Sequence, residues 1–238
     1  MSTSRPAADL SNLKVRLDSL RLEEEIPGLA VAVVYRGDIL DAYGLGVADI
    51  ETGRPVTGDT PFNVASVAKP VSGVLAMRLS ELGVLDLDAP LVRYAGFADF
   101  CAAALERGGI FFDDWSCGDP SLTMRHVLTM TSNGTPGTRF FYNPVAFSWM
   151  SRPIAEVGGA AFSDLIATHV YVPAAMDRSA RVHRDLPLRP DLARDLAQPH
   201  LTTPGANPVR SELPPPQGDG AAGGVISTPR DLARFDLA

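Results

Sequence analysis

The sequence of 238 residues has no apolar run that approaches the roughly 18 residues of a membrane span, and its first six residues, Met-Ser-Thr-Ser-Arg-Pro, lack the apolar stretch of a signal peptide. Cysteine occurs only twice, at Cys101 and Cys117, so neither a disulfide-dense scaffold nor a cysteine-rich metal site is expected. The redox state of the two thiols stays open. We expect a cytoplasmic protein without a membrane partner, unless a signal peptide has been removed.

Lysine is nearly absent, because Lys14 and Lys69 are the only two among 21 basic residues. The net charge is -7 and no basic run occurs, which argues against a nucleic-acid partner. A hydrophobic content of 45% with 21% charged residues is ordinary for one globular unit that buries a core. We therefore expect a small-molecule partner.

Both lysines stand in the same pattern, Ser-x-x-Lys, at Ser11 to Lys14 and at Ser66 to Lys69. Residues three apart share one face of a helix, so each pattern sets a hydroxyl beside an amine. A serine hydroxyl becomes a good nucleophile only when a base takes its proton, and a lysine serves as that base only as a neutral amine in apolar surroundings. A Ser-x-x-Lys pattern in apolar surroundings therefore suits nucleophilic catalysis.

The surroundings distinguish the two copies. Ser11 and Lys14 belong to residues 10–25, where leucines alternate with charges as on a solvated amphipathic helix. The second copy is rich in apolar neighbours, and Pro70 requires a helix to begin within a few residues of Ser66. A catalytic pair and a buried lysine beside an N-cap serine both fit these residues. The apolar neighbours expected to form a pocket for the amine are Val64, Ala65, Val67, Ala68, Val71 and Val74.

The remaining sequence predicts a mixture of strands and helices. Residues 29–35 and 39–48 flank Arg36-Gly37-Asp38, which is typical of a β-hairpin with its turn. Helical patterns follow Ser66, and residues 186–220 are rich in proline and glycine, which predicts a long loop. Thr228 and Pro229 predict the start of a last helix.

The stretch Ser66-Val67-Ala68-Lys69-Pro70, with its apolar helix running to Leu82-Gly83, resembles the serine beta-lactamase and penicillin-binding-protein superfamily. The similarity is to the class C beta-lactamase-like branch, which includes esterases and D-amino-acid peptidases. Residues 122–134 are similar to a helix and turn of that superfamily, although Met130 and Asn133 replace the usual histidine and glycine. Either replacement is compatible with the turn, since asparagine tolerates a left-handed helix cap.

The resemblance implies further site residues. Tyr142 takes the position of the family's tyrosine, where a phenol shares the proton of the lysine. Pro144 stands where the family has asparagine, so the role in substrate binding is lost, taken by another group, or shifted to Asn143, one residue early, which is the candidate. Apart from the resemblance, His200 lies at the start of the predicted loop and is a second candidate for the substrate cleft, with an ordinary surface histidine as the alternative.

The resemblance also implies an α+β fold of the beta-lactamase/transpeptidase type in one domain, residues 1–238. An antiparallel sheet lobe would comprise residues 1–65 and a helical lobe residues 70–222, with Ser66 at their junction. The family's third motif does not occur before Ala238, so we expect an incomplete sheet that lacks C-terminal strands. A missing segment, or a second copy in a homo-oligomer, would cover the hairpin.

The sequence therefore predicts a serine hydrolase that forms an acyl-enzyme at Ser66, with Lys69 and Tyr142 moving the proton. The substrate would be a beta-lactam, a D-amino-acid peptide or a carboxylic ester, and no metal or cofactor is expected. The alternative is a catalytically inactive scaffold that acts as a binding protein.

Overall fold

The computed structural model describes residues 10–115, 117–203, 206–212, 215 and 218–238. The N-terminal third holds the predicted hairpin, with β1 (Gly28–Tyr35) and β2 (Asp38–Asp49) antiparallel and Val31 opposite Tyr43. Arg36 and Gly37 in its turn have φ values of 52° and 86°, as a two-residue hairpin turn requires. The short β3 (Arg54–Pro55) adds to the free side of β2. The hairpin prediction is confirmed.

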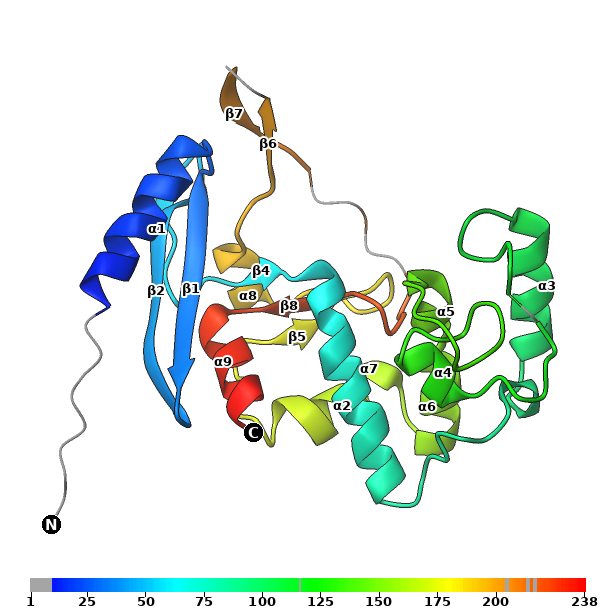
Figure 1. The fold of residues 1–238 in the computed structure, drawn as a ribbon. Helices are drawn as coiled ribbons and strands as arrows, with labels where there is room; N and C mark the ends of the chain where they lie inside the picture. Colours follow the sequence, from blue (N-terminus) through cyan, green and yellow to red (C-terminus); the bar gives the residue numbers. More distant parts are fainter. Residues whose placement is uncertain (1–9, 116, 204–205, 213–214, 216–217) are drawn as a thin grey trace, which may run out of the picture.

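Helix α1 (Ser11–Glu23) lies along the hairpin, as Figure 1 shows, yet none of its residues is buried. Polar contacts attach it: Lys14 forms an ion pair with Asp41 at 2.6 Å, and Arg21 donates to the carbonyl of Ile26 at 3.1 Å. The sequence predicted this helix correctly, and its leucines are at most partly buried. Residues 1–9, part of the predicted sheet lobe, lie outside the described residues.

A second sheet joins distant segments at the centre of the molecule. Its strand order is β4 (Phe62–Asn63), β8 (Val225–Ser227) and β5 (Ala180–Arg181), all antiparallel. Helix α9 (Pro229–Leu237) follows β8 and packs against β1 and β2. Its predicted cap is confirmed, because the Thr228 hydroxyl accepts a hydrogen bond from the Asp231 N–H at 3.1 Å. Strand β8 thereby connects the hairpin side of the molecule to the helical side.

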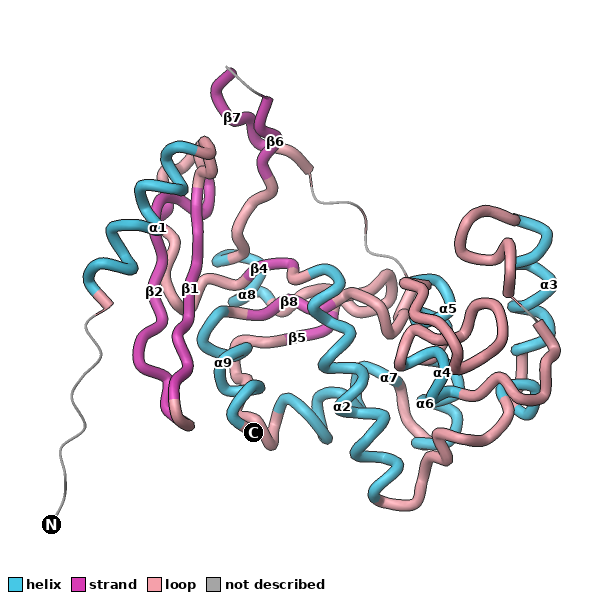
Figure 2. Tube along the Cα trace, in the orientation of Figure 1, coloured by secondary structure: helices cyan, strands magenta, loops and turns pink. Residues whose placement is uncertain are grey.

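The helical side is built around α2 (Ala68–Glu81), which follows a 3₁₀ turn at Ala65–Val67 and crosses the middle of the molecule in Figure 2. Its buried face, including Val71, Leu75 and Leu79, joins the main hydrophobic core. A turn of 3₁₀ helix at Leu91–Arg93 precedes the outer helices. These are α3 (Phe97–Arg107), α4 (Met124–Leu128), α5 (Pro144–Trp149), α6 (Ser151–Gly158), α7 (Phe162–Ile166) and a π-helical turn at Ala167–Tyr171.

Cys101 on α3 and Cys117 form a disulfide, a pairing that the sequence left open. Cys101 is buried in the core. No helix in the described part of the chain is both long and apolar enough to cross a bilayer. The α+β fold class is confirmed, whereas the exact division into lobes at residues 65 and 70 stays a prediction.

The predicted long loop at 186–220 is wrong in part. The structure forms α8 (Pro190–Asp195) there, followed by a hairpin of β6 (His200–Thr203) and β7 (Ala206–Arg210). Arg54 donates to the carbonyls of Asp195 and Leu196 at 2.7 and 2.6 Å, which ties the end of α8 to β3. Hydrogen bonds between residues so far apart in sequence cannot be predicted from local composition. Residues 204–205, 213–214 and 216–217 of the predicted loop lie outside the described residues.

Candidate active site

Ser66 lies on the 3₁₀ turn between β4 and α2, with its side chain exposed. The residue before it, Ala65, has a φ of 46°, a left-handed conformation that is uncommon for a residue other than glycine. Asn63 supports this turn, because its side-chain oxygen accepts a hydrogen bond from the Ala65 N–H at 3.0 Å. Backbone strain of this kind tends to occur at functional sites, where the surrounding structure holds it in place.

Lys69 is 8% exposed and reaches Ser66 as the sequence predicted. Its Nζ donates to Ser66 Oγ at 2.8 Å and to the Ala222 carbonyl at 3.2 Å. The pocket proposed for the amine needs correction, because Val67 is 52% exposed and Val74 is 44% exposed. The ring of Phe147, with its centroid 5.9 Å from Nζ, lies close to the amine instead.

Tyr142 completes a three-membered hydrogen-bonded group. Its hydroxyl lies 2.9 Å from Ser66 Oγ, and Lys69 Nζ lies 5.0 Å from the centroid of its ring. Hydrogen bonding with Lys69, and secondly with Ser66, holds the pKa of the Tyr142 phenol below its ordinary value near 10. A serine hydroxyl, an amine and a phenol thus lie within reach of one another, an arrangement suited to covalent catalysis.

Asn143 does not face this group, which corrects its predicted role in substrate binding. It is buried and caps α5: its side-chain oxygen accepts from the Ala146 N–H at 3.0 Å. Its amide nitrogen donates to the Phe111 carbonyl at 2.8 Å and to the side chain of Asn133 at 3.1 Å. Because the donors and the acceptor of the Asn143 amide are used inside the protein, the residue positions the segment that carries Tyr142.

Asn133 shares that buried network instead of forming a left-handed cap. Its amide donates to the Phe111 carbonyl and to Asp114, both at 2.9 Å. The left-handed positions of this turn are Met130, with φ of 57°, and Gly134, with φ of 67°. The sequence could not show this, because the partners of Asn133 come from a loop some twenty residues earlier.

His200, the other predicted substrate residue, lies at the start of β6 and away from Ser66. Its Nε2 accepts a hydrogen bond from the Ile50 N–H at 3.4 Å. It lines a separate hollow with Ile26, Pro27 and Gln198. The prediction for His200 is therefore wrong in its location. In the part of the chain that the structure describes, no three histidine, cysteine or acidic side chains gather as a metal site.

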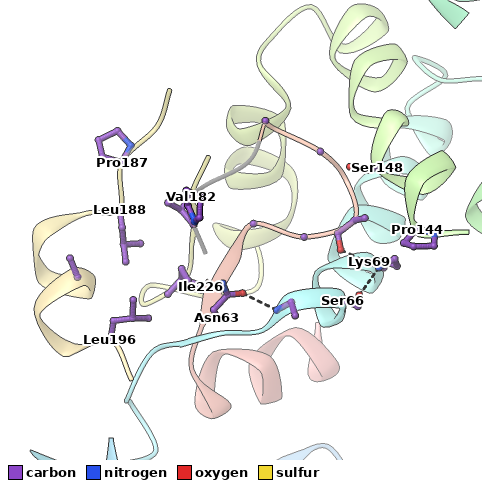
Figure 3. Close-up of a pocket in the computed structure, with 18 residues that line it drawn as sticks. Asn63, Ser66, Lys69, Pro144, Ser148, Val182, Pro187, Leu188, Leu196 and Ile226 are labelled. Atoms are coloured by element: carbon purple, nitrogen blue, oxygen red, sulfur yellow. Dashed lines mark hydrogen bonds between the residues drawn. The ribbon is translucent and has the colours of Figure 1, made fainter. Parts of the chain in front are cut away.

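A pocket of about 740 Å³ opens beside Ser66 and Lys69. Figure 3 shows Pro144 and Ser148 on the same side as the nucleophile and an apolar wall opposite. Sequence reasoning missed this wall, because its members come from three separate segments without a local motif. It consists of Val182, Pro187, Leu188, Leu196 and Ile226.

The chain is similar to known proteins in sequence and in fold. The chain matches the protein family described as Beta-lactamase over residues 13–238. It is 28% identical to Penicillin-binding protein 4 of Amycolatopsis lactamdurans over 95% of this chain and 63% of that protein. It is 35% identical to Esterase EstB of Burkholderia gladioli over 52% of this chain and 30% of that protein.

A solved structure of D-alanine carboxypeptidase AmpC from Burkholderia cenocepacia superposes with a TM-score of 0.72. The two sequences are 27% identical, and the match covers 98% of this chain and 64% of that one. The chain thus spans less than two thirds of the length of each of these three proteins.

Proposed function

The chain belongs to the beta-lactamase family, and from this premise we propose that it is a serine hydrolase that forms an acyl-enzyme at Ser66. The observation that carries the proposal is the position of Ser66 Oγ, which lies 2.8 Å from Lys69 Nζ and 2.9 Å from Tyr142 Oη. Both groups are able to take or return the serine proton at these distances.

In the proposed reaction, Ser66 Oγ attacks the carbonyl carbon of an ester or amide while its proton passes to Lys69 or Tyr142. The proton then goes to the departing alcohol or amine as the carbon–heteroatom bond breaks. Water attacks the acyl-enzyme, releases the acid and restores the Ser66 hydroxyl. The backbone N–H of Ser66, in the first turn of a helix, is a suitable donor to the developing oxyanion.

The pocket supports a carboxylic ester ahead of a beta-lactam or a D-amino-acid peptide. Its wall opposite the nucleophile is apolar, with Val182, Leu188 and Leu196 among its members. An uncharged acyl or alcohol group gains about 0.8 kcal/mol for each methylene that it buries there. The rate constant kcat/KM with p-nitrophenyl esters should therefore rise with acyl length, and it should exceed that with a penicillin.

Covalent labelling with a fluorophosphonate tests the nucleophile. The expected result is one adduct on Ser66, with release of fluoride, that is lost in Ser66→Ala and kept in Ser11→Ala, the matched change in the other Ser-x-x-Lys pattern. If the folded parent protein is not labelled, the hydrolase proposal fails and a binding protein on the same scaffold takes its place. If a penicillin acylates Ser66 faster than the esters turn over, the substrate assignment changes to a beta-lactam.

The disulfide bears on location. Disulfides persist in oxidising compartments and are rare in the cytosol of mesophiles. The Cys101–Cys117 bond therefore supports an oxidising compartment over the predicted cytoplasmic one. Thiol alkylation of the protein in freshly lysed cells of its source tests this, since unmodified cysteines indicate the disulfide and two alkylated cysteines contradict this location.

A further inference from the structure

The segment Gly220–Gly223, here called the carbonyl loop, passes directly beside Lys69. Its four consecutive carbonyl oxygens each accept a hydrogen bond from a side chain. Backbone carbonyls in a loop usually turn to solvent, so four in succession held by side chains indicate an imposed orientation. The four bonds are Arg181 Nη2 to Gly220 at 3.0 Å, Ser72 Oγ to Ala221 at 2.7 Å, Lys69 Nζ to Ala222 at 3.2 Å and Arg181 Nη1 to Gly223 at 2.9 Å.

Arg181 donates hydrogen bonds to both ends of the carbonyl loop, and Asp219 holds its side chain in place. Its side chain is 1% exposed, and its Nε and Nη2 donate to the same carboxylate oxygen of Asp219 at 3.0 and 2.7 Å. The other oxygen of Asp219 accepts the Ser163 N–H at 3.2 Å and lies 3.8 Å from His183 Nε2. A buried guanidinium needs such a partner, and its rigid fork then determines where the two carbonyls lie.

Close packing leaves the carbonyl loop little freedom to shift. A Cβ added at Gly220 would lie 2.0 Å from the Ser148 hydroxyl. At Gly224, just after the loop, φ is 74° and a Cβ would lie 2.9 Å from the Val182 carbonyl and 3.3 Å from Arg181 Nη2. Gly224 therefore suits its left-handed backbone and the close Val182 carbonyl, and a larger residue at Gly220 would displace the Ser148 hydroxyl.

The third bond of the series reaches the base of the proposed reaction. A neutral lysine amine has two N–H donors and one lone pair. When one N–H points to the Ala222 carbonyl, the lone pair is free to turn toward Ser66 Oγ, 2.8 Å away. An amine without that carbonyl rotates about its last bond and spends less time in the orientation that accepts the serine proton.

We propose that Ser72, Arg181 and Asp219 are positioning residues, which act by holding the Ala222 carbonyl against Lys69. The inference rests on the proposed hydrolase function, because it names what orients the base of that reaction. None of the three needs to contact the substrate, so their removal should slow acylation while leaving substrate binding nearly intact.

Ser72→Ala is the sharpest test, since it deletes one hydroxyl at a buried position with little change of volume. Its matched control is Ser179→Ala, which removes another buried serine hydroxyl, bonded to Ser227 at 2.8 Å and Asp231 at 2.9 Å. With a fluorophosphonate, Ser72→Ala should lower the first-order labelling rate about fivefold and leave the inhibitor's half-saturation concentration unchanged. Ser179→Ala should alter neither constant by more than about twofold.

Asp219 adds a rescue experiment. Asp219→Asn keeps an oxygen that accepts from Arg181, so the labelling rate should stay within about threefold of the parent. Asp219→Ala leaves the guanidinium without its partner and should lower the rate by about tenfold or more. If Asp219→Ala does not fold, the Ser72→Ala result decides alone. Unchanged rates in Ser72→Ala and Asp219→Ala, or changes in half-saturation only, overturn the proposal.

The scarcity of lysine provides a readout that needs no activity. With ¹³C-labelled lysine the protein gives two ε-carbon signals, and a Lys14→Arg variant assigns the one from Lys69. Ser72→Ala should shift or broaden the Lys69 signal, and Ser179→Ala should not. If the parent is not labelled by the probe yet this shift occurs, the hydrolase function fails, and the orientation of Lys69 by the carbonyl loop stands without a catalytic role. If the labelled parent shows no shift and no rate change in Ser72→Ala, the positioning role alone fails.

Discussion

The two Ser-x-x-Lys segments of this chain have the same spacing and even the same kind of aromatic neighbour, yet they differ in chemistry. At the first, Lys14 Nζ lies 4.4 Å from the ring centroid of Tyr43 and pairs with Asp41 at 2.6 Å. At the second, Lys69 Nζ lies 5.0 Å from the ring centroid of Tyr142 and bonds to Ser66 and to the Ala222 carbonyl.

The two lysines differ in the chemical groups that contact their amines. The Asp41 carboxylate satisfies Lys14 as a cation at a half-exposed surface. Lys69 is buried and bonds to the Ser66 hydroxyl and the Ala222 carbonyl, with the Tyr142 phenol nearby, and among the described residues no carboxylate pairs with it. A neutral environment for the amine is a requirement for a base, whereas a carboxylate neighbour favours the charged form.

The pKa values of the two neighbouring tyrosine phenols shift in opposite directions. Burial raises the pKa of the Tyr43 phenol, against a smaller opposing effect of Lys14. Its hydroxyl is buried and has no hydrogen-bond partner among the described residues. Hydrogen bonding with Lys69 and Ser66 lowers the pKa of the Tyr142 phenol. A lysine near the ring of a tyrosine is thus insufficient to lower the pKa of the phenol. Hydrogen bonding to the phenol hydroxyl determines the direction of the pKa shift.

Replacing each lysine by methionine tests this contrast with the largest expected effect. Lys69→Met should slow acylation of Ser66 about 10³-fold, since a positioned acid–base group contributes on this order. Lys14→Met should leave the rate unchanged. The second-order rate of fluorophosphonate labelling measures both, with the thermal unfolding midpoint as a check on folding. Equal loss in the two variants would contradict the assignment of the base.

Removing the Tyr142 hydroxyl should have the next largest effect. Tyr142→Phe should lower kcat/KM about 10²-fold through the loss of one proton carrier. In the parent protein, the increase of rate that follows ionisation of this phenol should occur below pH 10, because the pKa of Tyr142 is lowered. That limb should be absent from the pH profile of Tyr142→Phe and present in that of Tyr43→Phe. A limb retained in Tyr142→Phe belongs to another group.

Features determined by neighbours in sequence could be predicted. The start of α2 was evident from Pro70, the hairpin from its alternating strands and turn, and the cap of α9 from Thr228. The Ser66 to Lys69 contact follows in the same way, because helical spacing alone brings the two side chains together.

Features determined by distant packing could not be predicted. The Ala222 carbonyl reaches Lys69 from 153 residues further along the chain. Asn143 turned inward because the Phe111 carbonyl, 32 residues earlier, accepts from its amide. His200 lies in a hairpin that is held by distant contacts, such as the bond from Arg210 to Glu51, 159 residues earlier, and such contacts have no sequence signature. For the same reason the apolar wall opposite Ser66 was missed.

Tyr43→Phe should have a smaller effect, which is a gain in stability and not a loss of activity. A buried hydroxyl without a partner carries a desolvation cost, so its removal should stabilise the protein by about 1 kcal/mol. Urea unfolding of the parent and the variant measures the difference, and the labelling rate at Ser66 should not change. A loss of stability would show that the Tyr43 hydroxyl has a partner, such as an ordered water.

The smallest expected effect is the pH dependence contributed by the Lys14–Asp41 pair. Hydrogen bonding from Lys14 lowers the pKa of Asp41 in the folded protein, against the opposing effect of burial. The pair therefore stabilises the fold above the unfolded-state pKa of roughly 3.9, and this stabilisation is lost as the pH falls through the lower folded value. Because both side chains are partly exposed, the contribution should be about 0.5 kcal/mol and should decrease with salt. The free energy of unfolding in urea should be lower for Lys14→Met than for the parent by that amount at pH 6, and the difference should shrink as the pH falls through the folded pKa of Asp41. A difference that does not shrink in acid would assign the role of Lys14 to its contact with Tyr43 instead.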